Sequence, residues 1–277
     1  MTDLVDPATR AGVCVACHVG GESAADHRLM AAGHPRLGFE LHTFSELWRT
    51  SGGHAHYRAD ADHARRKGTV PPTTDWVQGL VVNPRAQSML IAERYGAGGA
   101  LPDFSLFNCY SCHRAMRLKD WREKPVTGGD PGALRFEDNA ARMLLAALAA
   151  RPALRDGLER DLRRLQSASG DSPAAVREAA AAAVRNLDGI GTALAETPLS
   201  AEESAQSLAA LVRAAGDGRF PDYAGAEQAA MSIALLAAAT GTAADHRTAI
   251  DDLFEALADD ERHDPARFAA LPKAIGR

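Results

Sequence analysis

The chain has 277 residues, of which 46% are hydrophobic and only 5% aromatic, and its net charge is −5. This length allows one large or two modest domains, and the low content of aromatic and β-branched residues favours helices over sheet. Residues 1–125 carry 15 basic and 13 acidic side chains, and residues 126–277 carry 16 and 23, so no basic stripe indicates binding to nucleic acid.

A five-residue pattern occurs twice in the chain. Residues 14–18 read C-V-A-C-H and residues 109–113 read C-Y-S-C-H, and together they use all four cysteines. C-x-x-C-H is the attachment signal for a c-type haem, because two thiols three positions apart reach the two vinyl groups on one haem edge and the adjacent imidazole reaches the iron. We therefore predict two covalently bound haem c groups, held by Cys14, Cys17 and His18 and by Cys109, Cys112 and His113.

Cysteine pairs of this spacing also occur in other kinds of site. A thioredoxin-like redox pair belongs in a βαβ context, which the sequence does not show. A zinc site built from two pairs usually has about 15–20 residues between them, whereas Cys17 and Cys109 are much farther apart, and zinc gives no reason for a histidine after both pairs. Disulfides are the remaining alternative if haem is never attached. Haem is the preferred interpretation because the whole motif is doubled.

The stretch between the two motifs predicts short helices and loops. A first helix is expected over residues 23–34, which begin with a capping-box pattern and end with a helix stop signal. A second helix is expected over residues 35–48. Residues 51–67 indicate a loop rich in glycine and histidine. A helix is expected over residues 74–95, with a possible interruption at Pro84.

The rest of the chain predicts helices. Residues 124–132 are rich in glycine and proline and indicate a linker. Beyond them leucine and valine recur at helical spacing, and Ser200 with Glu203 forms a capping box. Two further helices are expected over residues 223–240 and 242–257.

The predicted fold class is mainly α. An N-terminal dihaem cytochrome c region with few strands is expected at residues 1–125, followed by an alanine-rich, bundle-like helical region at residues 126–277. This second region shows no catalytic-triad motif and no phosphate-binding loop, so we expect it to be a scaffold or a docking surface.

Histidines gather near the two motifs, and eight of the ten lie at or before the end of the second one. His18 and His113 are the predicted proximal ligands. His42 belongs to the polar face of its predicted helix, so we expect it to be solvated. His27 and His34 fall on one helical face two turns apart, and two bis-histidine haems would need two further ligands.

The residues around these histidines follow a longer pattern. Residues 27–40 read H-R-L-M-A-A-G-H-P-R-L-G-F-E, residues 14–20 read C-V-A-C-H-V-G, and residues 108–113 read N-C-Y-S-C-H. The pattern resembles a multihaem (dihaem) cytochrome c family with the signature H-x-x-[IM]-A-A-G-H-P-R-L-x-F-E between a C-x-x-C-H-V-G start and a later [FY]-x-C-H motif. The resemblance implies an extracytoplasmic electron carrier with two low-spin haems. It also implies His27 and His34 as distal ligands, one per haem, with the choice of iron left open.

One element departs from the pattern of that family. Relatives tend to show Pro-x-His-Trp after the F-E run, whereas residues 53–57 here read G-H-A-H-Y. Three roles stay open for His54 and His56: polar groups of a loop, a distal ligand, or site residues beside an open iron.

Two functional hypotheses follow from these residues. In the preferred one, both irons are six-coordinate and the protein passes electrons one at a time, without a catalytic acid or base and therefore not as an enzyme. In the alternative, one iron keeps an open position and the protein is a haem oxidoreductase acting on peroxide or on a nitrogen or sulfur oxide. His54 or His56 would then be the acid or base. Met30 as an axial ligand is a lesser variant.

Location and partners are expected from the motifs. No run of 18 apolar residues occurs, so no transmembrane helix is predicted, and residues 1–13 lack the pattern of a signal peptide. Because bacteria attach haem to C-x-x-C-H outside the cytoplasmic membrane, we expect a periplasmic or otherwise exported protein whose leader this sequence does not include. The expected partners are redox proteins, within a larger electron-transfer complex or beside further copies of the chain.

Overall fold

The structure is a computed structural model of the chain. It describes residues 4–19, 32–33, 40–44, 61–97, 103–113 and 134–275. Almost all of the helix expected over residues 23–34, most of that expected over residues 35–48, and the linker expected over residues 124–132 lie outside the described residues.

The described part of the chain is helical, which confirms the predicted mainly α class. Its elements are α1 (Pro7–His18), α4 (Ala61–Lys67), α5 (Pro72–Arg94), η1 (Phe104–Leu106), η2 (Cys109–Ser111), α6 (Asn139–Ala147), α7 (Pro152–Ala168), α8 (Pro173–Glu196), α9 (Ala201–Gly216), α10 (Tyr223–Ala239), α11 (Arg247–Glu255), α12 (Pro265–Ala270) and η3 (Pro272–Ala274). Within these residues there is no strand, so the few strands expected in the N-terminal region are not supported. One antiparallel bridge joins Phe107 and Phe136. No helix of the described part has the length and apolar character needed to cross a membrane.

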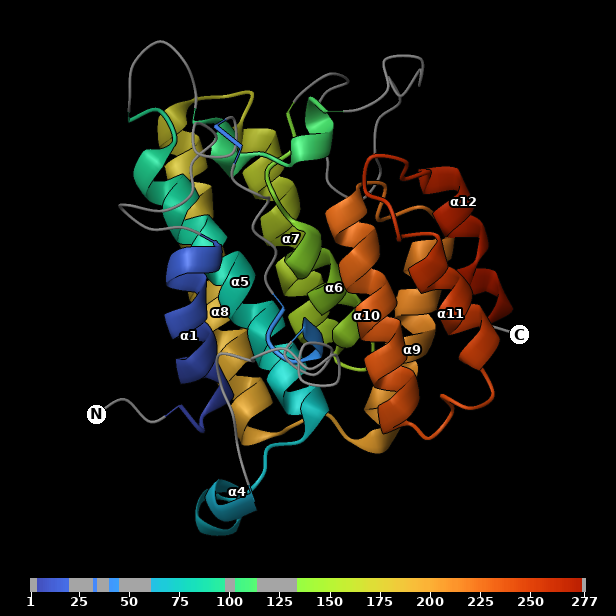
Figure 1. Cartoon of the computed structure of the whole chain (residues 1–277). Helices are drawn as coiled ribbons and strands as arrows, with labels where there is room; N and C mark the ends of the chain where they lie inside the picture. Colours follow the sequence, from blue (N-terminus) through green and yellow to red (C-terminus); the bar gives the residue numbers. More distant parts are fainter. Residues whose placement is uncertain are drawn as a thin grey trace.

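The main hydrophobic core lies where α5 meets the helices that follow the second motif. Figure 1 shows α6 and α10 in the middle, with α5, α7 and α8 to their left and α9, α11 and α12 to their right. Trp76 of α5 is 1% exposed, and its indole N–H donates to the buried hydroxyl of Ser232 at 2.8 Å. This contact ties α5 to α10 across the core.

Small side chains fill the interior of α6 and α10. The buried alanines are Ala140, Ala141, Ala146 and Ala147 in α6 and Ala226, Ala229, Ala230 and Ala237 in α10. Because the spacing of packed helices depends on the side chains at their contact, alanine lets the backbones approach closely. The core therefore closes with few aromatic residues.

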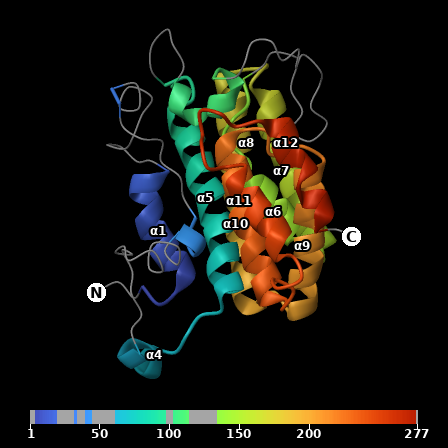
Figure 2. The same cartoon turned by 45° about the vertical axis from the view of Figure 1, so that its right-hand side comes forward.

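Helix α1 lies against the outer side of α5 in both views (Figure 1 and Figure 2). Its N-terminus is capped by Asp6, whose carboxylate accepts the Thr9 N–H at 2.7 Å, and Pro7 stands in the first turn, where its missing N–H is not needed. Ala11 and Val15, one turn apart, are buried in a small cluster with α5. This face sets the position of the last turn of α1.

A second hydrophobic cluster holds the residues that precede the second motif. The rings of Phe107 and Phe136 stack with centroids 5.1 Å apart, and Tyr95 meets Phe136 edge-on at 5.6 Å. Leu106 is buried in the same cluster, and Val19, directly after the first motif, packs against it. The two C-x-x-C-H segments therefore adjoin one hydrophobic cluster.

Helix α5 continues through Pro84, where the sequence left an interruption open. A proline in a helix interior removes one backbone hydrogen bond and strains the preceding turn. Burial of Trp76 before it and Ile91 after it, both 1% exposed, fixes the two halves of the helix against the core. Packing therefore outweighs the local penalty.

Two other elements differ from the prediction. Residues 61–67, expected in a loop, form α4, in which Asp62 pairs with Arg65 and Arg66 at 3.1 and 2.7 Å. Pairs three and four positions apart support an exposed helix. Helix α11 begins at Arg247, later than expected, because a hydrogen-bonded turn separates it from α10.

Candidate functional site

The first C-x-x-C-H motif forms the last turns of α1. Cys14 and Cys17 are three positions apart on a helix and therefore lie on the same face. Cys14 is partly buried beside the α1–α5 contact, Cys17 is exposed, and His18 is partly buried. The helix thus presents two thiols on one side, with the histidine adjacent to the second.

A buried arginine ties this helix to α5. The guanidinium of Arg10 donates to Asp75 Oδ1 at 2.6 Å. Burial raises the pKa of the Cys14 thiol, while Arg10 acts in the opposite direction. His42 Nδ1 lies 3.6 Å from Asp75 Oδ2, with its side chain 21% exposed. His42 was expected to be solvated, and the structure places it partly exposed beside this carboxylate, next to Leu41, which is buried in the α1–α5 contact.

The second motif begins with the short 3₁₀ turn η2. Asn108 precedes this turn, is 3% exposed, and caps it with Oδ1, which accepts the Tyr110 N–H at 3.1 Å. The His113 N–H donates to the Cys109 carbonyl at 2.8 Å, which continues the turn to the end of the motif. Cys109 and Cys112 are therefore three positions apart along a helical turn, as the first pair is, and both thiols are exposed.

Hydrogen bonds anchor this turn to the residues before α6. The Asn108 N–H donates to the Arg135 carbonyl at 2.8 Å, and the Glu137 N–H donates to the Leu106 carbonyl at 3.1 Å. The Asn108 Nδ2–H donates to Glu137 Oε2 at 2.8 Å. Inside the motif, the Ser111 hydroxyl accepts the Arg135 N–H at 3.2 Å. Backbone and side chains both hold the second motif against the helical bundle.

A buried network of charges lies behind this anchor. Arg135 is 3.3 Å from Asp138 and 3.1 Å from Asp222. Arg142 is 3.0 Å from Asp138, and the Asn139 Nδ2–H donates to Asp222 at 2.8 Å. All five side chains belong to buried residues, where an unpaired charge would be costly. The two arginines balance the two aspartates.

Glu137 is a further carboxyl at the edge of this network. Its Oε1 accepts the Asn139 N–H at 3.0 Å and its Oε2 accepts from Asn108 at 2.8 Å. Burial, with Asp222 as the next contribution, raises the pKa of Glu137 to about 7, although Arg135 acts in the opposite direction. Burial also works to raise the pKa of Asp222, but Arg135 holds it below its usual value. Near neutral pH, Asp222 stays ionised and Glu137 titrates.

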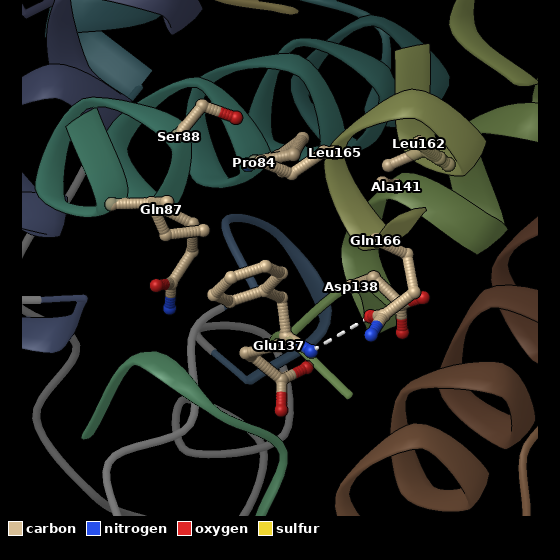
Figure 3. A pocket seen from close by; sticks show the side chains of 11 residues that line it. Pro84, Gln87, Ser88, Glu137, Asp138, Ala141, Leu162, Leu165 and Gln166 are labelled. Atoms are coloured by element: carbon tan, nitrogen blue, oxygen red, sulfur yellow. Dashed lines mark hydrogen bonds between the residues drawn. The ribbon is translucent and has the colours of Figure 1, made fainter. Parts of the chain in front are cut away.

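A cavity of about 20 Å³ lies beside Glu137, between α5, α7 and the residues before α6. Figure 3 shows Gln87 and Ser88 of α5 on one side of it and Glu137 and Asp138 on the other, with Gln166 next to Asp138. This volume holds about one water molecule.

The four cysteines of the chain can all be placed in the structure. All four belong to the described residues, and none forms a disulfide. Among the residues that the structure describes, no three Cys, His, Asp or Glu side chains gather as a metal-binding group.

The predicted distal ligands fall elsewhere in the chain. His27 and His34, and the further candidates His54 and His56, lie outside the described residues, as does Met30. Their roles stay predictions, and so does the choice of iron for each.

Glu40, the last residue of the stretch that resembles multihaem cytochromes, is described. Its carboxylate accepts the backbone N–H groups of His42 at 3.0 Å, of Phe44 at 3.1 Å and of Thr43. Burial raises the pKa of Glu40 and these hydrogen bonds act against the rise. Because Leu41 is buried beside α1, the end of this stretch is fixed next to the helix that carries the first motif.

The two turns fit covalent haem attachment on their donor chemistry. Each offers two cysteines three positions apart in a helical turn and a histidine on the next residue, and three of the four cysteines are exposed. A covalently attached haem would need such a donor set, with two thiols to form thioethers and an imidazole to bind the iron.

No protein family, curated protein or solved structure matches this chain. The resemblance of residues 14–20, 27–40 and 108–113 to multihaem cytochromes c stays a prediction.

Sequence reasoning did not identify Asn108 or Glu137 as part of the site. An asparagine directly before a helical turn is a local capping signal. This signal, had it been considered, would have identified Asn108. Glu137 lies 29 residues farther along the chain, and no local pattern connects it to the motif.

Proposed function

We propose that the protein is a dihaem c-type cytochrome that transfers electrons. The observation that carries the proposal is the doubled C-x-x-C-H motif, in which the two cysteines of each pair stand three positions apart in a helical turn. Each haem, when bound, supplies a one-electron iron couple. No catalytic acid or base is needed for this function.

The cysteines hold the two haems in this proposal. Cys14 and Cys17 would hold one haem through thioether bonds, and Cys109 and Cys112 would hold the other in the same way. Exposure of three of these thiols leaves them accessible for attachment. The α1–α5 contact and the anchor at the residues before α6 keep each pair in its turn.

The histidines close the coordination of the irons. His18 and His113, each directly after its second cysteine, present the proximal imidazoles. His27 and His34 are the proposed distal ligands, one per haem. Two imidazoles per iron would hold the reduction potentials below those of histidine–methionine haems.

Export and redox partners belong to the same proposal. Haem is joined to C-x-x-C-H outside the bacterial cytoplasmic membrane, so the protein would work in the periplasm or beyond it. Its partners would be one-electron redox proteins, which find their docking surface by charge and shape.

Haem content tests the proposal directly. The exported wild-type protein should show two c-type haems per chain in a pyridine haemochrome assay and in its intact mass. Each double variant, Cys14→Ala with Cys17→Ala and Cys109→Ala with Cys112→Ala, should keep one haem. Colourless wild-type protein with reactive thiols would contradict the proposal.

Electron paramagnetic resonance separates electron transfer from the oxidoreductase alternative. The ferric protein should show two low-spin signals, because six-coordinate irons have no open position. His27→Ala or His34→Ala should convert one haem to high spin, whereas His246→Ala, a variant remote in sequence from both motifs, should not. A high-spin signal in the wild-type protein would favour the oxidoreductase.

A further inference from the structure

The two C-x-x-C-H turns are supported in different ways. The first is the end of α1, a 12-residue helix with its own backbone hydrogen bonds and a side-chain cap. The second begins with η2, a turn of three residues, and so short a helical segment is not stable alone. It therefore depends on groups outside the motif, of which Asn108 is the nearest.

Both polar atoms of the Asn108 side-chain amide form hydrogen bonds. Its oxygen accepts the Tyr110 N–H at 3.1 Å, and its nitrogen donates to Glu137 Oε2 at 2.8 Å. A carboxylate only accepts hydrogen bonds, so its presence at the nitrogen end fixes the direction in which the amide points. Glu137 thereby keeps the capping oxygen on the haem-attachment turn.

Glu137 also carries the charge that the buried network does not balance. The charged groups around it are Arg135, Asp138 and Asp222, with Arg142 paired behind them. The polar groups that α5 and α7 contribute to the adjoining cavity are uncharged: Gln87, Ser88 and Gln166. Because two arginines offset two aspartates, ionisation of Glu137 leaves one net negative charge beside the second motif.

Building on the proposed function, we propose that Glu137 is a positioning residue for the second haem site, acting through Asn108, and that its charge makes the reduction potential of that site fall as the pH rises. An ionised Glu137 favours the more positive, oxidised state of the site. When a one-electron redox protein donates an electron there, the Glu137 carboxylate takes up a proton from solvent, so the net charge is unchanged. The pKa of Glu137, about 7, places this uptake near neutral pH.

Potentiometric titration at a series of pH values tests the coupling. The variant Cys14→Ala with Cys17→Ala isolates the second haem, whose potential should fall between about pH 6 and about pH 8, one unit either side of the Glu137 pKa. Adding Glu137→Gln should give a potential close to the low-pH value and nearly constant over that range, because glutamine resembles the protonated carboxyl. Glu178→Gln, an exposed glutamate on α8 paired with Arg164, should keep the original profile.

Proton uptake gives a readout that a purely structural role would not change. On reduction in lightly buffered solution near pH 7, the wild-type protein should take up more protons than Glu137→Gln. Equal uptake, or an unchanged pH profile in Glu137→Gln, overturns the coupling.

Two variants of Asn108 test the positioning role and remain informative if Glu137→Gln does not fold. Asn108→Ala removes the cap and should lower haem occupancy at the second motif relative to the first, as measured by peptide mass. Asn108→Ser keeps a capping oxygen and should retain the haem. Loss of the donor to the Glu137 carboxylate should raise the Glu137 pKa, so the pH profile of Asn108→Ser should move to higher pH. Full occupancy in Asn108→Ala, or an unmoved profile in Asn108→Ser, contradicts the inference.

Haem counting separates this inference from the proposed function. If the wild-type protein holds no haem, the proposed function fails. If it holds two and the potentials do not respond to Glu137, the inference fails and the proposed function stands.

Discussion

Asp222 shows how single buried polar residues position the second motif. Its carboxylate accepts the Gly225 N–H at 2.9 Å and the Asn139 Nδ2–H at 2.8 Å, and it pairs with Arg135 at 3.1 Å. One side chain therefore caps α10, holds the first residue of α6, and fixes the arginine whose backbone meets Asn108. Asp222 is thus linked through Arg135 to the turn that carries the second motif.

Gly225 is the residue at which this arrangement is most sensitive to added volume. A Cβ at this position would lie 2.9 Å from Asn139 Oδ1, so Gly225→Ala must displace Asn139 from Asp222. We expect a loss of about 1–3 kcal/mol in the free energy of unfolding, as for other disturbed buried hydrogen bonds, measured by urea denaturation. Gly189→Ala in α8, where a Cβ meets nothing within 4 Å, should be neutral or stabilising. Equal effects of the two substitutions would contradict this account.

At the scale of elements, the start of α9 was predicted and is confirmed. The Ser200 hydroxyl accepts the Glu203 N–H at 3.1 Å, and the Glu203 carboxylate accepts the Ser200 N–H at 2.9 Å. Arg151 adds a contact that the sequence did not indicate, donating to Glu203 at 2.8 Å. The hydrogen bond from Arg151, followed by that from the Ser200 N–H, lowers the pKa of Glu203 to about 2.

Removing the Ser200 hydroxyl that caps α9 should lower the stability of the protein. Ser200→Ala is expected to lower the free energy of unfolding by about 1 kcal/mol, whereas Ser200→Thr, which keeps the oxygen, should lose less. Denaturation followed by circular dichroism measures both, and equal losses would show that the hydroxyl is not the cause.

The lowered pKa of Glu203 gives a pH dependence with a definite sign. A carboxyl whose pKa falls on folding stabilises the protein above its unfolded pKa, near 4.5, and loses this contribution as the pH falls towards 2. The stability difference between the wild-type protein and Glu203→Gln should therefore shrink as the pH is lowered from about 5 to about 2. A difference that stays constant over this range would contradict the assigned role of Glu203.

At the scale of the whole molecule, α5 joins the regions before and after the second motif. Its residues Trp76, Val77, Leu80 and Val81 share one core with α6–α12. The division into a haem region at residues 1–125 and a helical region at residues 126–277 stays a prediction about sequence and chemistry. Packing in the shared core links the described residues of the two regions.

This shared core predicts cooperative unfolding. Amide protons of α5 and α10 should lose their protection from hydrogen exchange at the same denaturant concentration. The reason is that the hydrogen bond from Trp76 to Ser232 joins the two helices. Trp76→Ala should destabilise both by about 3–5 kcal/mol. Hydrogen exchange across the denaturant series measures each helix separately, and earlier loss in α5 alone would show two independent units.

Short-range features of this protein could be read from its residues without a structure. The helical class, the capping box at Ser200 and both cysteine pairs depend on spacings within one or two turns of chain. Packing decided what local signals could not: Pro84 does not interrupt α5, an outcome that the sequence left open, and His42, expected in solvent, lies partly exposed beside Asp75.

By itself, the sequence determined the two C-x-x-C-H motifs and the thiol and imidazole groups that they offer, because each motif lies within five residues. Only the tertiary structure decided that Asn108 meets Glu137 and that Glu137 adjoins the Arg135–Asp222 pair. These contacts join residues far apart in the chain, and both the partner and the burial that shifts a pKa exist only once the helices have packed.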